Sequence, residues 1–588
     1  MTQIETEVLI VGAGLTGATA AVALARHGID TMMVSRSAWV AGSPRAHITN
    51  QRTMEVLRSL GLEEASRAVA TPGELMANLP MMTSLAGLEF GRMWTWGNDP
   101  ARAGEYAAAS PGTGCDLPQN RVEPILVGEA MRRGVEVRFH TSFIALEQDA
   151  EGVTTTLHDA LTDTEITVRS RYVIGADGGR SAVAEALGLP MSGTDGLSPA
   201  LNVHVRADLS RYVADRPGSI FWVLQPGREG AMGNAIVRMV RPWTEWMIGF
   251  AYLDERMADG DLAQIEAEVR GLIGDDTIDI EILDTFAWRI NNVVAEEYRD
   301  ARVLCAGDAV HRHPPTSGLG GNTCVQDAFN LAWKLAAVLR WGAGDALLDT
   351  FTAERQPVGR VVVDRSIASW RHNPEVVRSL GIDPTAPAAE RQAAFEVLFE
   401  DSDAGERRRA AFQAAKRARD YSYHAHGTEM NHHYASSAVI DDGTPPVDDG
   451  RDPELHFQMS SRPGSRIPHA WVGLRGRTVS TLDLCGAERF TLLARARGAA
   501  WLTAAEEVSR DLGVPIAALR IGAGGEVADL YGRWGELAEI GETGALLVRP
   551  DQHVGWRIAR LSEDPRAALD EAMRAILSID FGEAARLG

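Results

Sequence analysis

The sequence predicts an α/β protein built from several domains, and three observations support this prediction. The chain has 588 residues, which is more than one hydrophobic core usually serves. Residues 6–36 read as a strand, a glycine-rich turn, a helix and a second strand, the pattern of a parallel-sheet unit. Between residues 201 and 284 the pattern changes to alternating strands, which indicates a separate antiparallel sheet.

The N-terminal unit carries a nucleotide-binding fingerprint. Gly12, Gly14 and Gly17 follow an apolar strand over 8–11 and open an Ala-rich helix over 18–27. In such units the glycines permit a tight turn, the close approach of a pyrophosphate and the close packing of helix and strand. A turn that needs small residues for packing alone is the alternative interpretation.

The second strand of this unit ends differently from most of its kind. An acidic residue usually accepts the ribose hydroxyls about 20 residues after the glycines, whereas this strand ends in Ser35 and Arg36. We expect Ser35, Arg36 and backbone groups to hold the adenosine end, with less charge than a carboxylate provides.

Composition and charge limit the classes of partner. The net charge of −22 disfavours nucleic acid and anionic membranes, which need clustered basic side chains. There is no apolar run of bilayer length and no signal-peptide pattern, so a cytoplasmic protein is expected. The 4 cysteines are scattered without a CxxC pair, and four histidines near residue 430 lack metal-ligand spacing, so neither a disulfide framework nor a metal site is expected.

The next elements lead to polar loops. Residues 44–52 form a loop with Arg45 and His47, and a helix is expected from Thr53. Gln119 precedes a helix predicted over 127–133. A strand over 135–139 and a hairpin turning near 149–152 follow.

Two later strands end in acidic glycine turns. Asp177 and Gly178 follow one strand, and Gly307 and Asp308 follow the other. Ligands of open α/β sheets bind at the carboxyl ends of strands. The second turn runs into a glycine-rich loop and a helix over 323–339, whose N-terminus offers N–H groups to an anion or a carbonyl. An ordinary Asp-Gly turn is the alternative for Asp177.

The alternating segment predicts strands over 201–205, 220–224, 235–239 and 246–252. Its aromatic residues are Phe221, Trp222, Trp243, Trp246, Phe250 and Tyr252. We expect one aromatic sheet face, which either is core or lies over a flat cofactor.

The last third of the chain divides at a linker. A charged helix is expected over 386–421, and a Pro- and Asp-rich linker over 441–453. Beyond residue 466, strands and helices alternate, which indicates a small α/β domain.

Three motifs now stand in order on one chain: the Gly12 fingerprint, Asp177-Gly178 and Gly307-Asp308. Together they resemble the FAD-dependent aromatic hydroxylases, single-component monooxygenases that use NADPH or NADH and O2. Four further stretches resemble the branch of phenol hydroxylases and 2,4-dichlorophenol 6-monooxygenases: 44–55, 222–227, 237–243 and 306–315.

The resemblance implies a Rossmann-like FAD-binding domain, an antiparallel-sheet substrate domain and a C-terminal thioredoxin-like domain. The implied boundaries are 1–190 and 286–390 for the two parts of the FAD-binding domain, 191–285 for the substrate domain, 391–455 for a helical connector and linker, and 456–588 for the C-terminal domain. The C-terminal domain has no CxxC, so it is not expected to be redox-active.

The resemblance also implies the residues of the site. The implied FAD contacts are Gly12, Gly14, Gly17, Ser35, Arg36, Arg45, Gln119, Asp177, Gly178, Gly307, Asp308, Pro315, Gly318, Gly320, Gly321 and Asn322. The catalytic candidates are His47 and Pro315, which lies in the loop beside the isoalloxazine. The expected substrate contacts are His47, Trp222, Gln225, Met239, Trp246, Trp288 and Asn291.

His47 is the candidate base because related phenol hydroxylases have an aspartate at the matching position, and an imidazole can accept a proton near neutral pH. The alternative is that His47 only hydrogen-bonds flavin or backbone. A second nucleotide fingerprint is absent, so we expect NAD(P)H to bind in a surface groove and the flavin to move outward to meet it.

The implied reaction is hydroxylation of a phenol ortho to its hydroxyl through a flavin C4a-hydroperoxide. A tailoring hydroxylase of a larger natural-product phenol or hydroxypyridine, of piericidin type, is the alternative within this class. An FAD oxidoreductase without oxygen insertion and a flavin-binding redox sensor are alternatives from other classes. The expected partner is a small aromatic substrate, and a homo-oligomer is expected.

Overall fold

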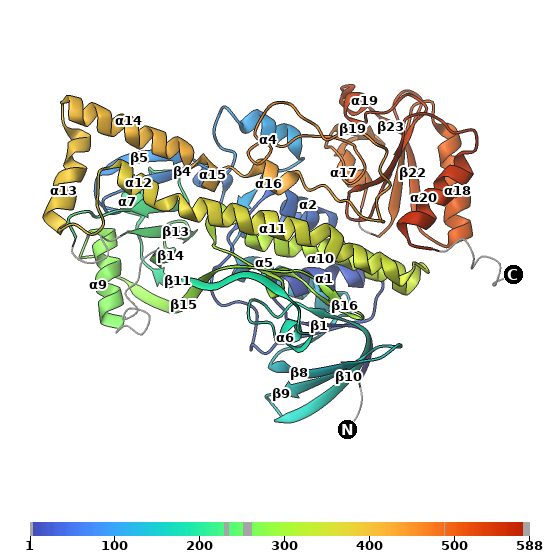
Figure 1. The fold of residues 1–588 in the computed structure, drawn as a ribbon, viewed down its shortest axis with the longest axis horizontal. Helices are drawn as coiled ribbons and strands as arrows, with labels where there is room; N and C mark the ends of the chain where they lie inside the picture. Colours follow the sequence, from blue (N-terminus) through green and yellow to red (C-terminus); the bar gives the residue numbers. More distant parts are fainter. Residues whose placement is uncertain (1–3, 229–233, 251–261, 487, 580–588) are drawn as a thin grey trace.

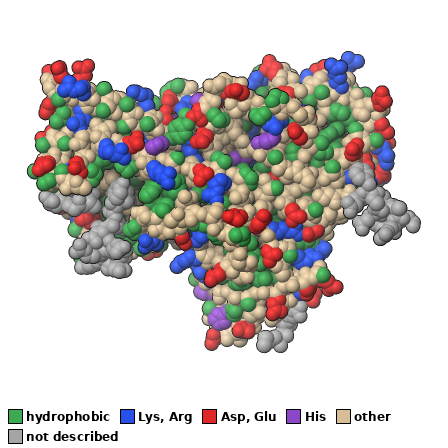
Figure 2. Space-filling view, in the orientation of Figure 1, with side chains coloured by type: hydrophobic (Ala, Val, Ile, Leu, Met, Phe, Trp, Pro, Cys, Tyr) green, Lys and Arg blue, Asp and Glu red, His purple; other side chains and the backbone are tan. Residues whose placement is uncertain are grey.

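The computed structural model describes residues 4–228, 234–250, 262–486 and 488–579. Three large sheets, a two-stranded sheet of β3 (Ile48–Thr49) and β6 (Cys115–Asp116), and the surrounding helices and loops make up these residues; Figure 1 shows the arrangement of the larger elements. In this part of the chain no helix combines the length and the apolar character needed to cross a bilayer. Acidic and basic side chains are interspersed over the face in Figure 2.

The first sheet has eight strands and brings distant segments together. Its main order is β16-β17-β10-β1-β2-β7, and the hairpin β8-β9 pairs with β10. The strands are β1 (Ile4–Val11), β2 (Thr31–Val34), β7 (Glu136–Arg138), β8 (Thr141–Gln148), β9 (Val153–Asp159), β10 (Thr164–Gly175), β16 (Arg299–Asp300) and β17 (Val303–Cys305). Five of these, β17, β10, β1, β2 and β7, are parallel neighbours. The turns after β1, β10 and β17 therefore meet at one edge.

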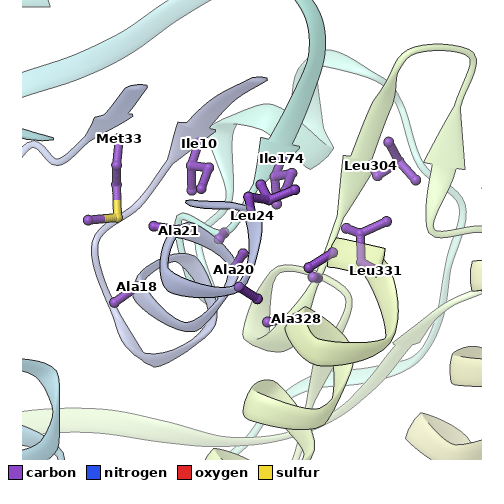
Figure 3. Close-up of a cluster of buried hydrophobic side chains, with 14 of the residues drawn as sticks. Ile10, Ala18, Ala20, Ala21, Leu24, Met33, Ile174, Leu304, Ala328 and Leu331 are labelled. Atoms are coloured by element: carbon purple, nitrogen blue, oxygen red, sulfur yellow. The ribbon is translucent and has the colours of Figure 1, made fainter. Parts of the chain in front are cut away.

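Two helices cover one face of this sheet. Helix α1 (Leu15–Arg26) packs along α10 (Gly320–Arg340) through small side chains, among them Ala20 and Ala328 (Figure 3). Small residues allow the two helix axes to approach closely. The N-termini of both helices can therefore contact one ligand. The predicted helix at 127–133 is longer than expected: α5 (Gln119–Arg132) begins directly after Pro118, and Pro124 lies inside it.

The second sheet runs β18-β15-β11-β14-β13-β12-β4-β5 and is antiparallel except between β12 and β4. Its strands are β4 (Asn78–Met82), β5 (Glu89–Trp94), β11 (Met191–Arg206), β12 (Ile220–Val223), β13 (Ala235–Arg241), β14 (Glu245–Phe250), β15 (Glu281–Ala295) and β18 (His311–Arg312). The predicted boundaries need correction here, since β4 and β5 lie far upstream of residue 191 and β15 continues past residue 285. Sheet pairing joins these segments regardless of their sequence distance.

The expected single aromatic face is also wrong. Phe221 and Trp222 are neighbours in β12 and point to opposite faces, because successive side chains of a strand alternate. Phe221 packs with Trp246 and with α9 (Leu262–Ile273), whereas Trp222 joins a different cluster. Tyr252, predicted at the end of this sheet, lies outside the described residues.

Helices connect the second sheet to the third. They are α11 (Thr350–Arg371), α12 (Asn373–Ser379), α13 (Ala388–Glu396), α14 (Asp403–Ala418), α15 (Asp420–Tyr423) and α16 (His426–Met430). The single charged helix expected over 386–421 is broken, because Ser402 caps a new helix by accepting a hydrogen bond from the N–H of Gly405.

The third sheet, β20-β19-β23-β22-β21-β24-β25, belongs to the C-terminal α/β unit. Its strands are β19 (Trp471–Leu474), β20 (Arg477–Ser480), β21 (Phe490–Arg495), β22 (Ile516–Ile521), β23 (Val527–Ala528), β24 (Ala545–Val548) and β25 (Val554–Ile558). Helices α18 (Ala499–Leu512) and α20 (Pro565–Ile576) pack on one face, and their core includes Trp333 of α10. The C-terminal unit is thus packed directly onto a helix of the first sheet.

Candidate functional site

The glycine turn after β1 is built for close approach. A Cβ on Gly12 would lie 2.1 Å from the carbonyl oxygen of Ala176, and one on Gly17 would lie 1.8 Å from that of Gly12. Gly14 differs, since its nearest neighbour would be Oε1 of Glu123 at 3.4 Å. Gly12 and Gly17 are therefore fixed by backbone packing, whereas Gly14 leaves an open cradle beside the helix start.

Two helix N-termini meet at this cradle. Neither α1 nor α10 has a side-chain cap or an acidic residue in its first turn. A Cβ on Gly321, in the first turn of α10, would lie 3.3 Å from Leu15, the first residue of α1. Uncapped helix starts present N–H groups and partial positive charge to an anion. The arrangement fits a pyrophosphate-containing cofactor such as FAD.

The loop after β2 closes one side of the cradle. The carbonyl oxygen of Arg45 accepts a hydrogen bond from the N–H of Gln119 at 2.8 Å. Glu123 accepts from Gln119 Nε2 at 2.5 Å and from the N–H of Ala41 at 2.8 Å. Burial raises the pKa of Glu123. The two predicted cofactor residues Arg45 and Gln119 therefore lie side by side, next to an acid that the sequence did not single out.

The adenosine end of the predicted site lies at the end of β2. Ser35 follows β2, and its hydroxyl accepts a hydrogen bond from the N–H of Ser37 at 3.3 Å. Arg36 is exposed beside it.

Asp177 builds its own turn. Its carboxylate accepts hydrogen bonds from the hydroxyl of Ser181 at 2.5 Å and from the N–H groups of Ala182 and Val183 at 2.7 and 3.2 Å. Gly178 follows with φ +85°, a conformation that favours glycine. The carboxylate thus fixes the turn at the sheet edge.

The second acidic turn, at Gly307 and Asp308, is fixed by buried side chains beneath it. The N–H of Gly307 donates to Asp327 at 3.0 Å, and Asp327 is also paired with Arg355 at 2.7 Å and with His311 at 2.8 Å. Asp308 is exposed, with Sγ of Cys324 3.6 Å from its carboxylate. A buried ionic group therefore fixes Gly307 and leaves Asp308 accessible to a ligand.

The loop from Pro315 to Asn322 is clamped to the start of α2 (Gln51–Ser59). Asn322 donates to the carbonyl oxygens of Gly318 at 2.7 Å and Ile48 at 2.8 Å, and accepts from the N–H of Asn50 at 2.9 Å. The side chain of Asn322 is therefore occupied within the protein. Ser317, buried inside the loop, and Gly318 have φ values of +67° and +63°, and Gly320 and Gly321 begin α10.

His47 is held by a buried carboxylate. It precedes β3 (Ile48–Thr49), which pairs with β6 (Cys115–Asp116). This ladder places Nδ1 of His47 2.9 Å from Oδ2 of Asp116. The carboxylate accepts, so Nδ1–H donates and Nε2 keeps its lone pair. Burial, together with the charge of Arg238, lowers the pKa of His47 to about 4, and the ring is a neutral proton acceptor at pH 7.

Arg238 of β13 faces this pair. It is only 8% exposed, and its Nε and Nη2 have no hydrogen-bond partner among the described residues. Burial lowers its pKa to about 10, so the guanidinium remains charged at neutral pH. A buried cation with unused donors indicates a place for an anionic or hydrogen-bond-accepting group.

Strand alternation decides which predicted substrate contacts can reach this group. Trp222 lies on the same sheet face as Arg238, because their strands pair Trp222 with Ile236 and Ile220 with Arg238. Trp288 also shares that face by register, and its Nε1 is buried without a partner in the described chain. These two stay candidates for the substrate wall.

The other four predicted substrate contacts, Gln225, Met239, Trp246 and Asn291, lie away from the group formed by His47, Asp116 and Arg238. Met239 and Trp246 point to the opposite face, into the core under α9. Gln225 lies beyond the end of β12, where it donates to the carbonyl oxygen of Gly271 at 2.7 Å. Asn291 accepts a hydrogen bond from the N–H of Gly196 at 2.8 Å, whereas Oδ1 of its neighbour Asn292 is buried and unpaired in the residues described.

Sequence reasoning missed Asp116 and Arg238 as site residues. Asp116 precedes the Leu-Pro-Gln stretch but belongs to no motif, and only the pairing of β3 with β6 brings it to His47. Arg238 stood inside a stretch noted for its resemblance. The available signal was a charged residue at an inward position of an apolar strand.

Two family models match the chain. One describes an FAD binding domain and matches residues 5–366, and the other describes the C-terminal part of aromatic-ring hydroxylases and matches residues 460–579.

Several known proteins are similar over nearly their whole length. The 2,4-dichlorophenol 6-monooxygenase of Delftia acidovorans is 47% identical, with 98% of this chain and 99% of the relative covered. The phenol 2-monooxygenase of Pseudomonas sp. (strain EST1001) is 42% identical, with 97% and 92% covered.

Among solved structures, the flavin-dependent monooxygenase PieE in complex with FAD and substrate gives a TM-score of 0.93 at 43% identity, covering 98% of this chain and 100% of PieE. Aklavinone-11 hydroxylase with FAD and aklavinone gives 0.80 at 32% identity, with the same coverage.

Proposed function

The chain belongs to the FAD-dependent aromatic-ring hydroxylases, and we propose that it hydroxylates a small phenol ortho to the existing hydroxyl, with His47 as the proton acceptor. The observation that carries this proposal is the buried His47–Asp116 pair facing the unpaired donors of Arg238. Two relatives, by name, act on 2,4-dichlorophenol and on phenol, which supports a substrate of this size.

The enzyme uses FAD, NAD(P)H and O2, as its monooxygenase relatives do. When bound and reduced, FAD supplies the activated oxygen that is transferred to the ring. We infer that the open cradle at Gly14 and the starts of α1 and α10 hold the pyrophosphate, with Arg45 and Gln119 alongside. We infer that Asp308 accepts hydrogen bonds from hydroxyl groups of the ribityl chain, and that Ser35 and Arg36 hold the adenosine.

The proton of the phenol goes to Nε2 of His47. A phenol has an ordinary pKa of about 10, whereas the pKa of His47 is about 4. The gap of about six pKa units corresponds to about 8 kcal/mol, so His47 alone is too weak a base to form the phenolate.

Arg238 compensates for much of this gap. A guanidinium about 4 Å from the phenolate oxygen contributes about 4 kcal/mol at an effective dielectric constant of 20. The remaining free-energy cost of proton transfer becomes smaller when electron-withdrawing substituents make the phenol more acidic. This site therefore favours chlorinated phenols over phenol itself, which supports 2,4-dichlorophenol as the substrate to test first. Pro315 and Trp288 are proposed to shape the space and exclude water.

The test is anaerobic flavin reduction by NADPH and by NADH, with and without 2,4-dichlorophenol, followed by oxygen and product analysis. We expect the phenol to accelerate reduction and a chlorocatechol to form, faster than catechol forms from phenol. If dichlorophenol gives only peroxide, the small-phenol proposal is wrong. A panel of larger phenols and hydroxypyridines then tests the alternative suggested by the similarity to PieE.

The role of each domain is proposed on the same grounds. Residues 1–190 and 286–390, apart from β4, β5, β18 and part of β15, form the Rossmann-like FAD-binding domain, and the second sheet forms the substrate domain. Residues 456–588 form a thioredoxin-like domain, joined by the connector 391–455. We further propose a homo-oligomer, which size-exclusion chromatography with light scattering would test.

A further inference from the structure

Helix α2 is a short helix that buries several polar and charged side chains. Gln51, Arg52 and Glu55 are 2%, 4% and 2% exposed. Buried charges are stable only when paired and hydrogen-bonded. The position of α2 therefore depends on the groups that satisfy these side chains.

The partners of Gln51 lie outside the C-terminal unit, whereas the two charged side chains, Arg52 and Glu55, are held mainly by the C-terminal unit. Arg466 forms a two-point ion pair with Glu55, with Nε–Oε2 and Nη2–Oε1 distances of 2.7 and 2.5 Å. Arg52 donates to Oε1 of Gln552 at 2.8 Å and to the carbonyl oxygen of Asp551 at 2.7 Å. Two fork-shaped guanidinium groups thus fix both the distance and the orientation between α2 and this unit.

The partner loop of α2 is itself immobilised. The carboxylate of Asp551 accepts from Arg549 at 2.5 Å and from Asn330 of α10 at 3.0 Å. Arg549 also pairs with Glu354 of α11, at 2.6 Å. The loop between β24 and β25 is therefore anchored on α11 and on α10, whose N-terminus belongs to the predicted cofactor site.

The other end of α2 reaches the reaction site. Asn50 caps the helix by accepting from the N–H of Thr53 at 3.0 Å, and its own N–H donates to Asn322. His47 lies three residues before this cap. Glu55 is five residues beyond it, so only about 7.5 Å of helix separates Glu55 from the cap. A rigid element of this length transmits a shift with little loss.

We propose that the C-terminal unit positions the hydroxylation site, with Arg466 and Glu55 as positioning residues that hold α2, and through α2 hold His47 and the 315–322 loop. Neither residue is proposed to touch substrate. This inference rests on the proposed role of His47. The consequence is a tight ratio of product formed to NAD(P)H oxidised, because that ratio depends on how accurately the ring is placed.

The test compares two lysine variants of buried arginines in the same unit. Arg466→Lys keeps the charge but loses the two-point geometry. Arg557→Lys is the matched control: Arg557 is 7% exposed and pairs with Asp442 and Glu539 at 2.6 and 2.7 Å, away from α2. Both variants are loaded with FAD. Each variant is then assayed at the same number of degrees below its own melting temperature, so that a difference in stability does not enter the comparison.

For Arg466→Lys we expect product per NAD(P)H to fall by on the order of tenfold, with faster amide exchange at residues 47–50. Arg557→Lys keeps the wild-type ratio and exchange there. The positioning role is wrong if Arg466→Lys retains wild-type coupling and exchange, or if Arg557→Lys uncouples equally. If the wild type forms no product from any phenol, the proposed function fails, and the exchange comparison alone decides the role of Arg466. If Arg466→Lys does not fold, Glu55→Gln, which leaves Arg466 without its carboxylate, is compared with Glu539→Gln by the same two readouts.

Discussion

Replacing Asp116 by asparagine tests the proton acceptor most directly. The two side chains have the same shape, and Asp116 is fully buried 2.9 Å from Nδ1 of His47, so the packing should survive. The change removes the negative charge beside the imidazole. Taking about 4 Å as the separation between the centres of the carboxylate and the ring, this charge is worth about 4 kcal/mol at an effective dielectric constant of 20. It also allows the amide to donate to Nδ1, which would put the proton on Nε2.

Both effects oppose the reaction, since His47 loses basicity and presents the wrong nitrogen. Loss of general base catalysis typically costs 10²- to 10⁴-fold, and we expect product formation by Asp116→Asn to fall within this range. The assay is single-turnover hydroxylation of 2,4-dichlorophenol, with FAD occupancy checked by absorbance. The control is Asp163→Asn, which alters a His–Asp pair of 3.0 Å in an exposed hairpin. A fully FAD-loaded Asp116→Asn enzyme with wild-type turnover would refute the assignment of His47.

Four further results are expected. Arg238→Met should raise the pKa of a bound nitrophenol, followed by its absorbance, by up to about three units; an unchanged pKa would exclude contact with the phenolate oxygen. Gly17→Ala should abolish FAD binding or cost about 3 kcal/mol in denaturant unfolding, because its Cβ would overlap the carbonyl oxygen of Gly12; tight FAD binding by a stable variant contradicts this. Glu354→Gln leaves buried Lys334 without its carboxylate and buried Arg549 with Asp551 as its remaining ion-pair partner, and should cost about 3–5 kcal/mol, read as a fall in melting temperature. The pKa of His47 is about 4 in the fold against 6.5 ordinarily, so its share of stability, about 3 kcal/mol, is complete above pH 6.5 and is lost as the pH falls towards 4; unfolding of wild type and His47→Gln across this range measures it.

Local sequence patterns were sufficient for the parts of the fold that depend on neighbouring residues. The glycine turn, its two strands and the helix between them follow from residues close in sequence, and β2 begins and ends where predicted. The hairpin near residue 150 and the alternation of strands and helices in the C-terminal unit follow in the same way. The order of the three motifs was enough to identify the FAD-dependent hydroxylase family, which the comparisons confirm.

The site itself depended on contacts between distant segments. Asp116 reaches His47 because β3 pairs with β6, and the β4-β5 pair joins the rest of the second sheet through β12. The face on which each aromatic residue lies was set by strand register, so Met239 and Trp246 turned out to be core. The sequence by itself determined the cofactor loops and the class of chemistry, because turn geometry and helix starts are local. The tertiary structure alone decided which charges are buried together, because pairing and burial are set by residues far apart in the chain.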